Sequence, residues 1–162
     1  MKLKIVVALL LTLVTLGSSG AATDEPALLA KISQLLSADG YSYTQPPSHS
    51  DVWRIERTAK TLKNFKVIVA ASNDSNSNLV VIFVTVVRSK DMRLTPEFMT
   101  ALLHLNDGLD RIKVGIDRDG DLFVRTDVTG RILDAQELRT QIEQVATSAN
   151  EVYEAAQPYL SR

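Results

Sequence analysis

Residues 78–87 read NLVVIFVTVV, and Thr85 is the only polar side chain after Asn78. A strand with one face in water alternates apolar and polar side chains, because successive side chains point to opposite faces of the sheet. Here both parities are apolar. One carries Leu79, Val81, Phe83 and Val87, and the other carries Val80, Ile82, Val84 and Val86. The pattern predicts a central strand that is covered on both faces.

The cover of the second face has three alternatives. A second helix of the same chain could lie on it, because helices can straddle a sheet. A partner protein or a second copy of the chain could bind it, since large exposed apolar patches mark interaction surfaces. A small apolar ligand is the third alternative. Core packing is the first interpretation of the strand aromatics, and the candidate apolar interface consists of Trp53, Phe65, Val81, Phe83 and Phe123.

The N-terminus has the three parts of a secretory signal peptide. Lys2 and Lys4 precede an apolar run at residues 5–16, and the small residues GSSGAA follow at 17–22. An uncleaved membrane anchor is the alternative, but a membrane-spanning helix needs about 20 apolar residues. The sequence therefore predicts a cleaved signal at residues 1–22 and a single domain at 23–162. The mature protein would be periplasmic or extracellular in a bacterium, with no membrane association after cleavage.

Composition narrows the classes of function. Without Lys2 and Lys4 the mature chain carries 16 basic and 19 acidic side chains, a net charge of −3. A nucleic-acid-binding protein needs a basic face, so nucleic acid is not an expected partner. The chain has no cysteine, which excludes thiol redox chemistry and cysteine-ligated metals.

Hydrophobic periodicity gives the order of the elements. Spacing of three and four residues predicts helices at residues 23–40, 95–108 and 134–157. Their candidate N-terminal caps are Asp24, Thr95 and Asp134. Short apolar or alternating runs predict strands at residues 52–58, 65–72, 79–87, 111–117 and 121–127. The resulting order is α-β-β-β-α-β-β-α. Its partial segregation of helices and strands predicts an α+β fold with an antiparallel sheet packed against helices.

The segment DRDGD at residues 117–121 resembles part of a calcium-binding loop. An EF-hand loop needs glycine at its sixth position and glutamate at its twelfth, whereas here Gly120 is fourth and Val128 is twelfth. The segment also lies between two predicted strands. An Asp-Gly hairpin turn explains it better.

Neither histidine is placed in a recognisable active site. His49 lies in a loop rich in proline and serine, and His104 shares a helix face with Asp107. A His–Asp pair can orient a base or hold a metal, but the sequence contains no GxSxG, HExxH or Ser-x-x-Lys motif. We therefore expect that the protein is not an enzyme, has no catalytic residues and binds no metal or cofactor. A hydrolase that uses His104 with Asp107 and Asp110 is kept as an alternative.

Residues 102–128, LLHLNDGLDRIKVGIDRDGDLFVRTDV, and the helix beginning LDAQELRTQIEQV resemble the YbjN-type family of bacterial sensory transduction regulators. The typical run is a helix ending in Leu-x-x-Leu-Asn, a hairpin with an Asp-Gly turn and a long closing helix. Here these are Leu102, Leu105 and Asn106, then Asp119 and Gly120, then residues 134–157. The helix before Gly40 and the strand containing Trp53 also fit.

The resemblance implies a fold similar to type III secretion chaperones. Such a protein has an α+β sheet backed by helices, often pairs as a dimer and offers grooves to protein segments, without catalytic residues. The predicted signal departs from the pattern, because those chaperones act in the cytoplasm. The sequence thus predicts an exported, non-enzymatic, chaperone-like or regulatory module that binds a protein partner or itself as a homodimer. A carrier of a small apolar ligand is the alternative.

Overall fold

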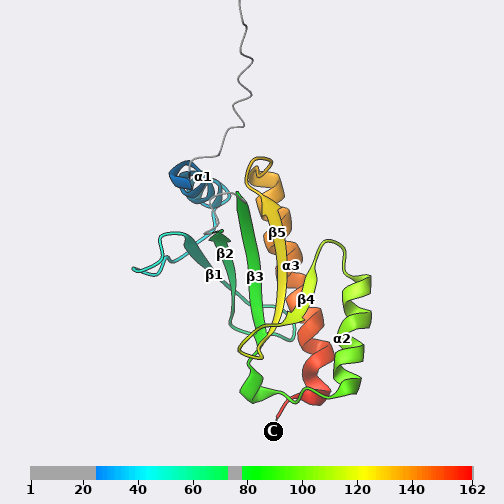
Figure 1. Cartoon of the computed structure of the whole chain (residues 1–162). Coiled ribbons are helices and arrows are strands. Elements are labelled where there is room, and N and C mark those ends of the chain that lie inside the picture. The colour runs from blue at the N-terminus through cyan, green and yellow to red at the C-terminus, as the bar shows by residue number, and fades with distance from the viewer. Residues whose placement is uncertain (1–24, 73–77, 162) are drawn as a thin grey trace, which may run out of the picture.

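The structure is a computed structural model, and it describes residues 25–72 and 78–161. In chain order its elements are α1 (Glu25–Ala38), β1 (Val52–Arg57), β2 (Phe65–Ala71), β3 (Leu79–Val87), η1 (Ser89–Asp91), α2 (Pro96–Gly108), β4 (Lys113–Ile116), β5 (Leu122–Thr129), α3 (Ala135–Ala156) and η2 (Gln157–Tyr159). Apart from the short 3-10 turns η1 and η2, this is the predicted order, and the α+β class is confirmed (Figure 1).

The five strands form one antiparallel sheet in the order β1-β2-β3-β5-β4. The first three strands make a meander. The chain then leaves the sheet through α2, returns at the far edge as β4, and folds back so that β5 lies between β4 and β3. The strand with two apolar parities, β3, is therefore central and pairs on both sides.

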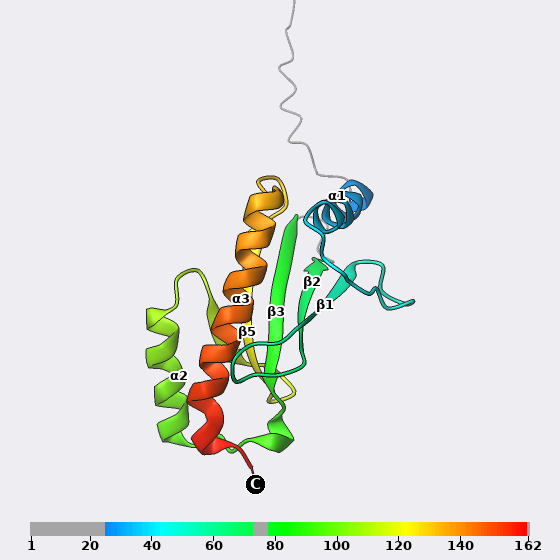
Figure 2. The same ribbon diagram turned by 180° about the vertical axis from the view of Figure 1, so that it is seen from behind.

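The helices of residues 25–72 and 78–161 leave one face of the sheet uncovered. Helix α3 lies along β3 and β5, α1 packs against α3, and α2 packs against α3 and the edge strand β4. Figure 2 shows α3 in front of the strands, whereas Figure 1 views the opposite face, over which no described helix runs. The alternative in which the described helices straddle the sheet is therefore wrong. We call this uncovered side the open face.

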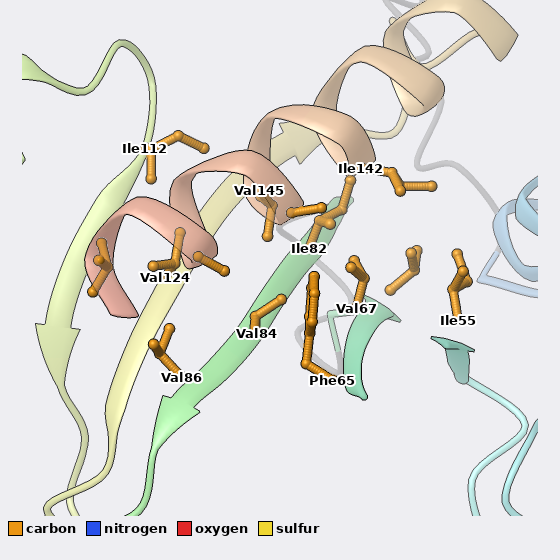
Figure 3. Close-up of a cluster of buried hydrophobic side chains, with 14 of the residues drawn as sticks. Ile55, Phe65, Val67, Ile82, Val84, Val86, Ile112, Val124, Ile142 and Val145 are labelled. Atoms are coloured by element: carbon orange, nitrogen blue, oxygen red, sulfur yellow. The ribbon is translucent and has the colours of Figure 1, made fainter. Parts of the chain in front are cut away.

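The core fills the space between α3 and the sheet (Figure 3). It contains Val84 of β3, Val124 of β5 and Val145 of α3, all fully buried. On α3 the apolar positions step by four and three residues, so one stripe of the helix faces the sheet throughout. The stripe consists of Leu138, Ile142, Val145, Ala149, Val152 and Ala156, and every member is buried.

Polar contacts at the helix ends fix the layer in place. The Asp134 carboxylate accepts a hydrogen bond of 2.8 Å from the Glu137 amide, which caps the start of α3 as predicted. At the end of α1, the buried Asp39 carboxylate pairs with Arg139 of α3. The Lys31 ammonium donates to the Gly130 carbonyl at 3.0 Å. These contacts hold α1 to the same side of the sheet as α3.

Residues 117–121 form the hairpin turn between β4 and β5, as the Asp-Gly sequence predicts. Gly120 has a φ of 82°, and the Asp117 carboxylate accepts from the Asp119 and Asp121 amides at 2.9 Å each. Asp121 instead ties the turn to the end of β3. The backbone N–H of Ser89 and the guanidinium of Arg88 both donate to its carboxylate, and they hold the pKa of Asp121 below its usual range.

None of the helices in residues 25–72 and 78–161 combines the length and apolar character that crossing a membrane requires. The predicted signal peptide at residues 1–22 lies outside the described residues.

Candidate functional site on the open face

The two rows of β3 differ in their surroundings. Val80, Ile82 and Val84 face α3 and are fully buried, whereas Leu79, Val81, Phe83 and Thr85 face the open side and are half-buried. A bulge between Thr85 and Val87 turns the end of the strand, so that both Val86 and Val87 are buried. Val87 is therefore buried, although in the sequence it has the same parity as Leu79, Val81, Phe83 and Thr85, which face the open side.

Two of the five residues of the candidate interface belong to the core instead. Trp53 is fully buried, and its indole N–H donates to the Ser33 hydroxyl of α1 at 3.1 Å. Phe65 is 7% exposed and points toward the α3 side (Figure 3). The prediction that Trp53 and Phe65 lie on an open interface is wrong, because their parity in β1 and β2 faces the helix layer.

The other three residues lie together on the open face. Phe83 is paired with Ile68 of β2 on one side and Arg125 of β5 on the other. Val81 precedes it in the same row, and Phe123 lies beside Thr85 across the β3–β5 pair. Val81, Phe83 and Phe123 are each half-buried, mainly by their neighbours in the sheet. We call these three side chains together with Ile68 the open-face patch.

Gly115 gives Phe123 its place in the patch. The two residues pair across β4 and β5, and a methyl group on Gly115 would lie only 2.8 Å from the Cζ atom of Phe123. The phenyl ring therefore lies over the bare glycine backbone of the edge strand. This contact extends the apolar surface from β3 to the edge of the sheet.

Two adjoining hollows lie over the patch. The larger has a volume of about 910 Å³ and is lined by Arg54, Lys66 and Ile68 on the open face and by Phe65, Val86 and Tyr153 on the helix side, and the smaller has about 180 Å³. Phe83 and Thr85 line both. The larger hollow lies where β2 parts from β3, since their pairing stops at Ile68 and Phe83 although β2 begins at Phe65.

Charged side chains border the patch. On the β4–β5 side, Asp127 accepts hydrogen bonds of 2.6 Å from both Lys113 and Arg125. Burial favours the neutral acid, but the two cations outweigh it and lower the pKa of Asp127 below its usual range. On the β1 side, Lys66 pairs with Glu56 at 3.2 Å. The Arg54 guanidinium has no hydrogen bond or ion pair with the described residues.

The His104–Asp107 pair considered for catalysis is exposed and forms no catalytic site among the described residues. His104 and Asp107 both lie on the exposed side of α2. His49 is also exposed, 3.9 Å from Asp51. Within residues 25–72 and 78–161 no three histidine, aspartate or glutamate side chains are grouped as metal ligands.

Large exposed apolar side chains also occur away from the open face. Leu103 on α2 is 69% exposed and Ile132 before α3 is 67% exposed, with Leu94 and Met99 next to them in exposure. Met99 and Leu103 lie four residues apart on one face of α2, and single exposed apolar side chains are normal at protein surfaces. They provide matched controls for substitutions in the open-face patch.

The helix layer on a five-stranded antiparallel sheet has the same fold as chains in type III secretion and chaperone–effector complexes, so the chain has a type III secretion chaperone-like fold. The chain belongs to the YbjN family, described as "Putative bacterial sensory transduction regulator", which its sequence matches over residues 28–158. No curated protein is a significant match to the sequence.

Solved structures share this fold at low sequence identity. A chain of the heterodimeric ExoU–SpcU complex from the type III secretion system of Pseudomonas aeruginosa matches with a TM-score of 0.58 and 15% identity, over 78% of this chain and 98% of that chain. YbjN from E. coli gives 0.57 and 14%, over 83% and 96%. A chain of the HopA1–SchA chaperone–effector complex gives 0.55 and 13%, over 81% and 98%.

Proposed function

We propose that this chain is an exported, non-enzymatic, chaperone-like protein that binds segments of other proteins on its open face. One observation carries the proposal: Val81, Phe83 and Phe123 lie side by side, half-buried, on a sheet face that no described helix covers. Burial of apolar surface drives most protein association. A partner that removed the rest of this patch from water would gain that free energy.

The structural neighbours support a protein ligand over a small one. The ExoU–SpcU and HopA1–SchA structures are complexes of two different proteins, and the second is a chaperone with its effector. A second copy of the chain is the alternative protein partner.

Binding of a permanently unfolded protein tests the proposal. We expect the mature chain to bind fluorescently labelled α-lactalbumin that has been reduced and carboxymethylated, and not the native, folded form. Phe83→Ser should weaken this binding about two- to fivefold, because burying a whole phenylalanine side chain is worth about 1.5–3 kcal/mol and binding adds only the part of Phe83 that the fold leaves exposed. Fluorescence anisotropy measures the binding.

Leu103→Ser is the matched control, because it removes an exposed apolar side chain from α2 instead of the open face. It should bind like the wild type. Equal loss in both variants, or no binding by the wild type, would contradict the proposal. Light scattering over a dilution series identifies self-association, and a lipid recovered in equal amount with the purified chain would favour the carrier of an apolar ligand.

Export is a separate part of the proposal and rests on residues 1–22. We expect the chain expressed in a bacterium to be recovered from the periplasm or the medium, lighter by the mass of residues 1–21 or 1–22. Intact mass spectrometry measures this. A full-length chain found only in the cytoplasm would contradict export and leave the binding proposal unaffected.

A further inference from the structure

Five side chains form a straight row across the open face. The strand registers pair Arg54 with Ile68, Ile68 with Phe83, Phe83 with Arg125, and Arg125 with Lys113. The row therefore runs perpendicular to the strands, through all five of them. Its centre is apolar and both of its ends are cationic.

The row has an excess of positive charge. Arg54, Arg125 and Lys113 are opposed by one carboxylate in contact with the row, that of Asp127, which both Lys113 and Arg125 share. Arg54 has no ionic partner among the described residues. Asp117, which lines the smaller hollow, directs its carboxylate to its own turn amides. Glu56, two residues after Arg54 in β1, pairs with Lys66 of β2 and not with Arg54.

The row also has a defined length. Neighbouring strands lie about 4.8 Å apart, so the three spacings from Arg54 to Arg125 cover about 14 Å. In an extended peptide, every second side chain points to the same side, and residues i and i+4 are separated by about 13 Å. An extended segment lying across the strands would therefore place residues i, i+2 and i+4 over Arg54, over Ile68 and Phe83, and over Arg125.

We propose that the open face recognises an extended protein segment of the form acid-x-apolar-x-acid, lying across the strands. This inference rests on the proposed function and specifies the partner. The apolar side chain fills the hollow over Ile68 and Phe83, and the two carboxylates pair with Arg54 and Arg125. The segment binds through its side chains, because the backbone groups of a central strand are already paired within the sheet.

Three synthetic peptides test the proposal by NMR titration of the isotope-labelled mature chain. The first is Ser-Glu-Ser-Phe-Ser-Glu-Ser, the second has glutamine in place of both glutamates, and the third is Ser-Ser-Ser-Phe-Glu-Glu-Ser, with the same composition and different spacing. We expect the first to shift the signals of Arg54, Ile68, Phe83 and Arg125 most. Because an exposed ion pair changes an equilibrium constant by up to about fivefold, the second should bind about tenfold more weakly.

Arg54→Gln separates the charge rule from simple apolar binding. It should weaken binding of the first peptide about threefold and leave the glutamine peptide unchanged, since only the first offers a carboxylate to Arg54. Arg131→Gln, in the exposed turn before α3, is the matched control and should change neither.

Equal binding of all three peptides, with Phe83 still required, would overturn the charge and spacing rule while the proposed function stood. Signal changes confined to another surface would overturn the assignment of the row. If no peptide binds and unfolded α-lactalbumin binds, the segment chemistry is wrong. Failure of both probes would overturn the inference together with the proposed function.

Discussion

Replacing Trp53 with alanine should lower the free energy of unfolding by about 3–5 kcal/mol, the usual cost of removing a large aromatic side chain from a core. Trp53 is fully buried, and its indole N–H is the hydrogen-bond donor to Ser33 of α1. The substitution leaves a cavity beneath α1 and removes the partner of a part-buried hydroxyl. Because small domains are stable by about 5–15 kcal/mol, the variant should lose a large share of its stability.

Phe83→Ala is the matched comparison on the opposite face. Its side chain is half-buried among neighbouring strands, so we expect a loss of only about 1–2 kcal/mol. Urea unfolding followed by far-UV circular dichroism measures both variants, since Trp53 is the only tryptophan and its fluorescence is lost with it. Equal costs for the two substitutions would show that the helix face and the open face have been assigned wrongly.

The sequence was sufficient to predict which elements form and in which order. Helix α3 begins where the Asp134 cap predicts and buries the stripe that its spacing predicts. The turn at residues 117–121 follows from Asp-Gly chemistry. These features depend on residues close together in the chain, for which local periodicity and capping are direct evidence.

The side of β3 that the helices cover could not be predicted from that strand alone. Periodicity separates Val81 from Ile82 but does not indicate which of them faces a helix, because both are apolar. The burial of Trp53 and Phe65 corrects their assignment to the interface. The alternation within β2 did indicate its buried face. Phe65 shares that face with Val67 and Val69, all three buried, whereas Lys66 shares the other face with Ile68. Relating these faces to those of β3 required the strand pairings.

The cross-strand row was also beyond the sequence alone. Arg54 and Arg125 lie 71 positions apart in the chain and share a row only because β5 inserts next to β3. The bulge at Thr85 and Val87 had no signature in the run of valines. Such non-local features depend on strand order, which the hydrophobic pattern leaves undetermined.

Thiol labelling tests most directly whether the second face of β3 is open. The chain has no cysteine, so Val81→Cys and Ile82→Cys each introduce a single thiol at adjacent positions on opposite faces. A fully buried thiol reacts only after the protein opens. Since each 1.4 kcal/mol of opening free energy slows the reaction tenfold, an opening cost of about 4 kcal/mol makes it about a thousandfold slower.

We therefore expect iodoacetamide to label the Val81→Cys variant in the native state, and the Ile82→Cys variant about a thousandfold more slowly. Saturating unfolded α-lactalbumin should then slow labelling at position 81 and leave position 82 unchanged. Slow labelling at both positions at every protein concentration would mean that the second face is covered within the molecule. That result would contradict an open face available to a partner.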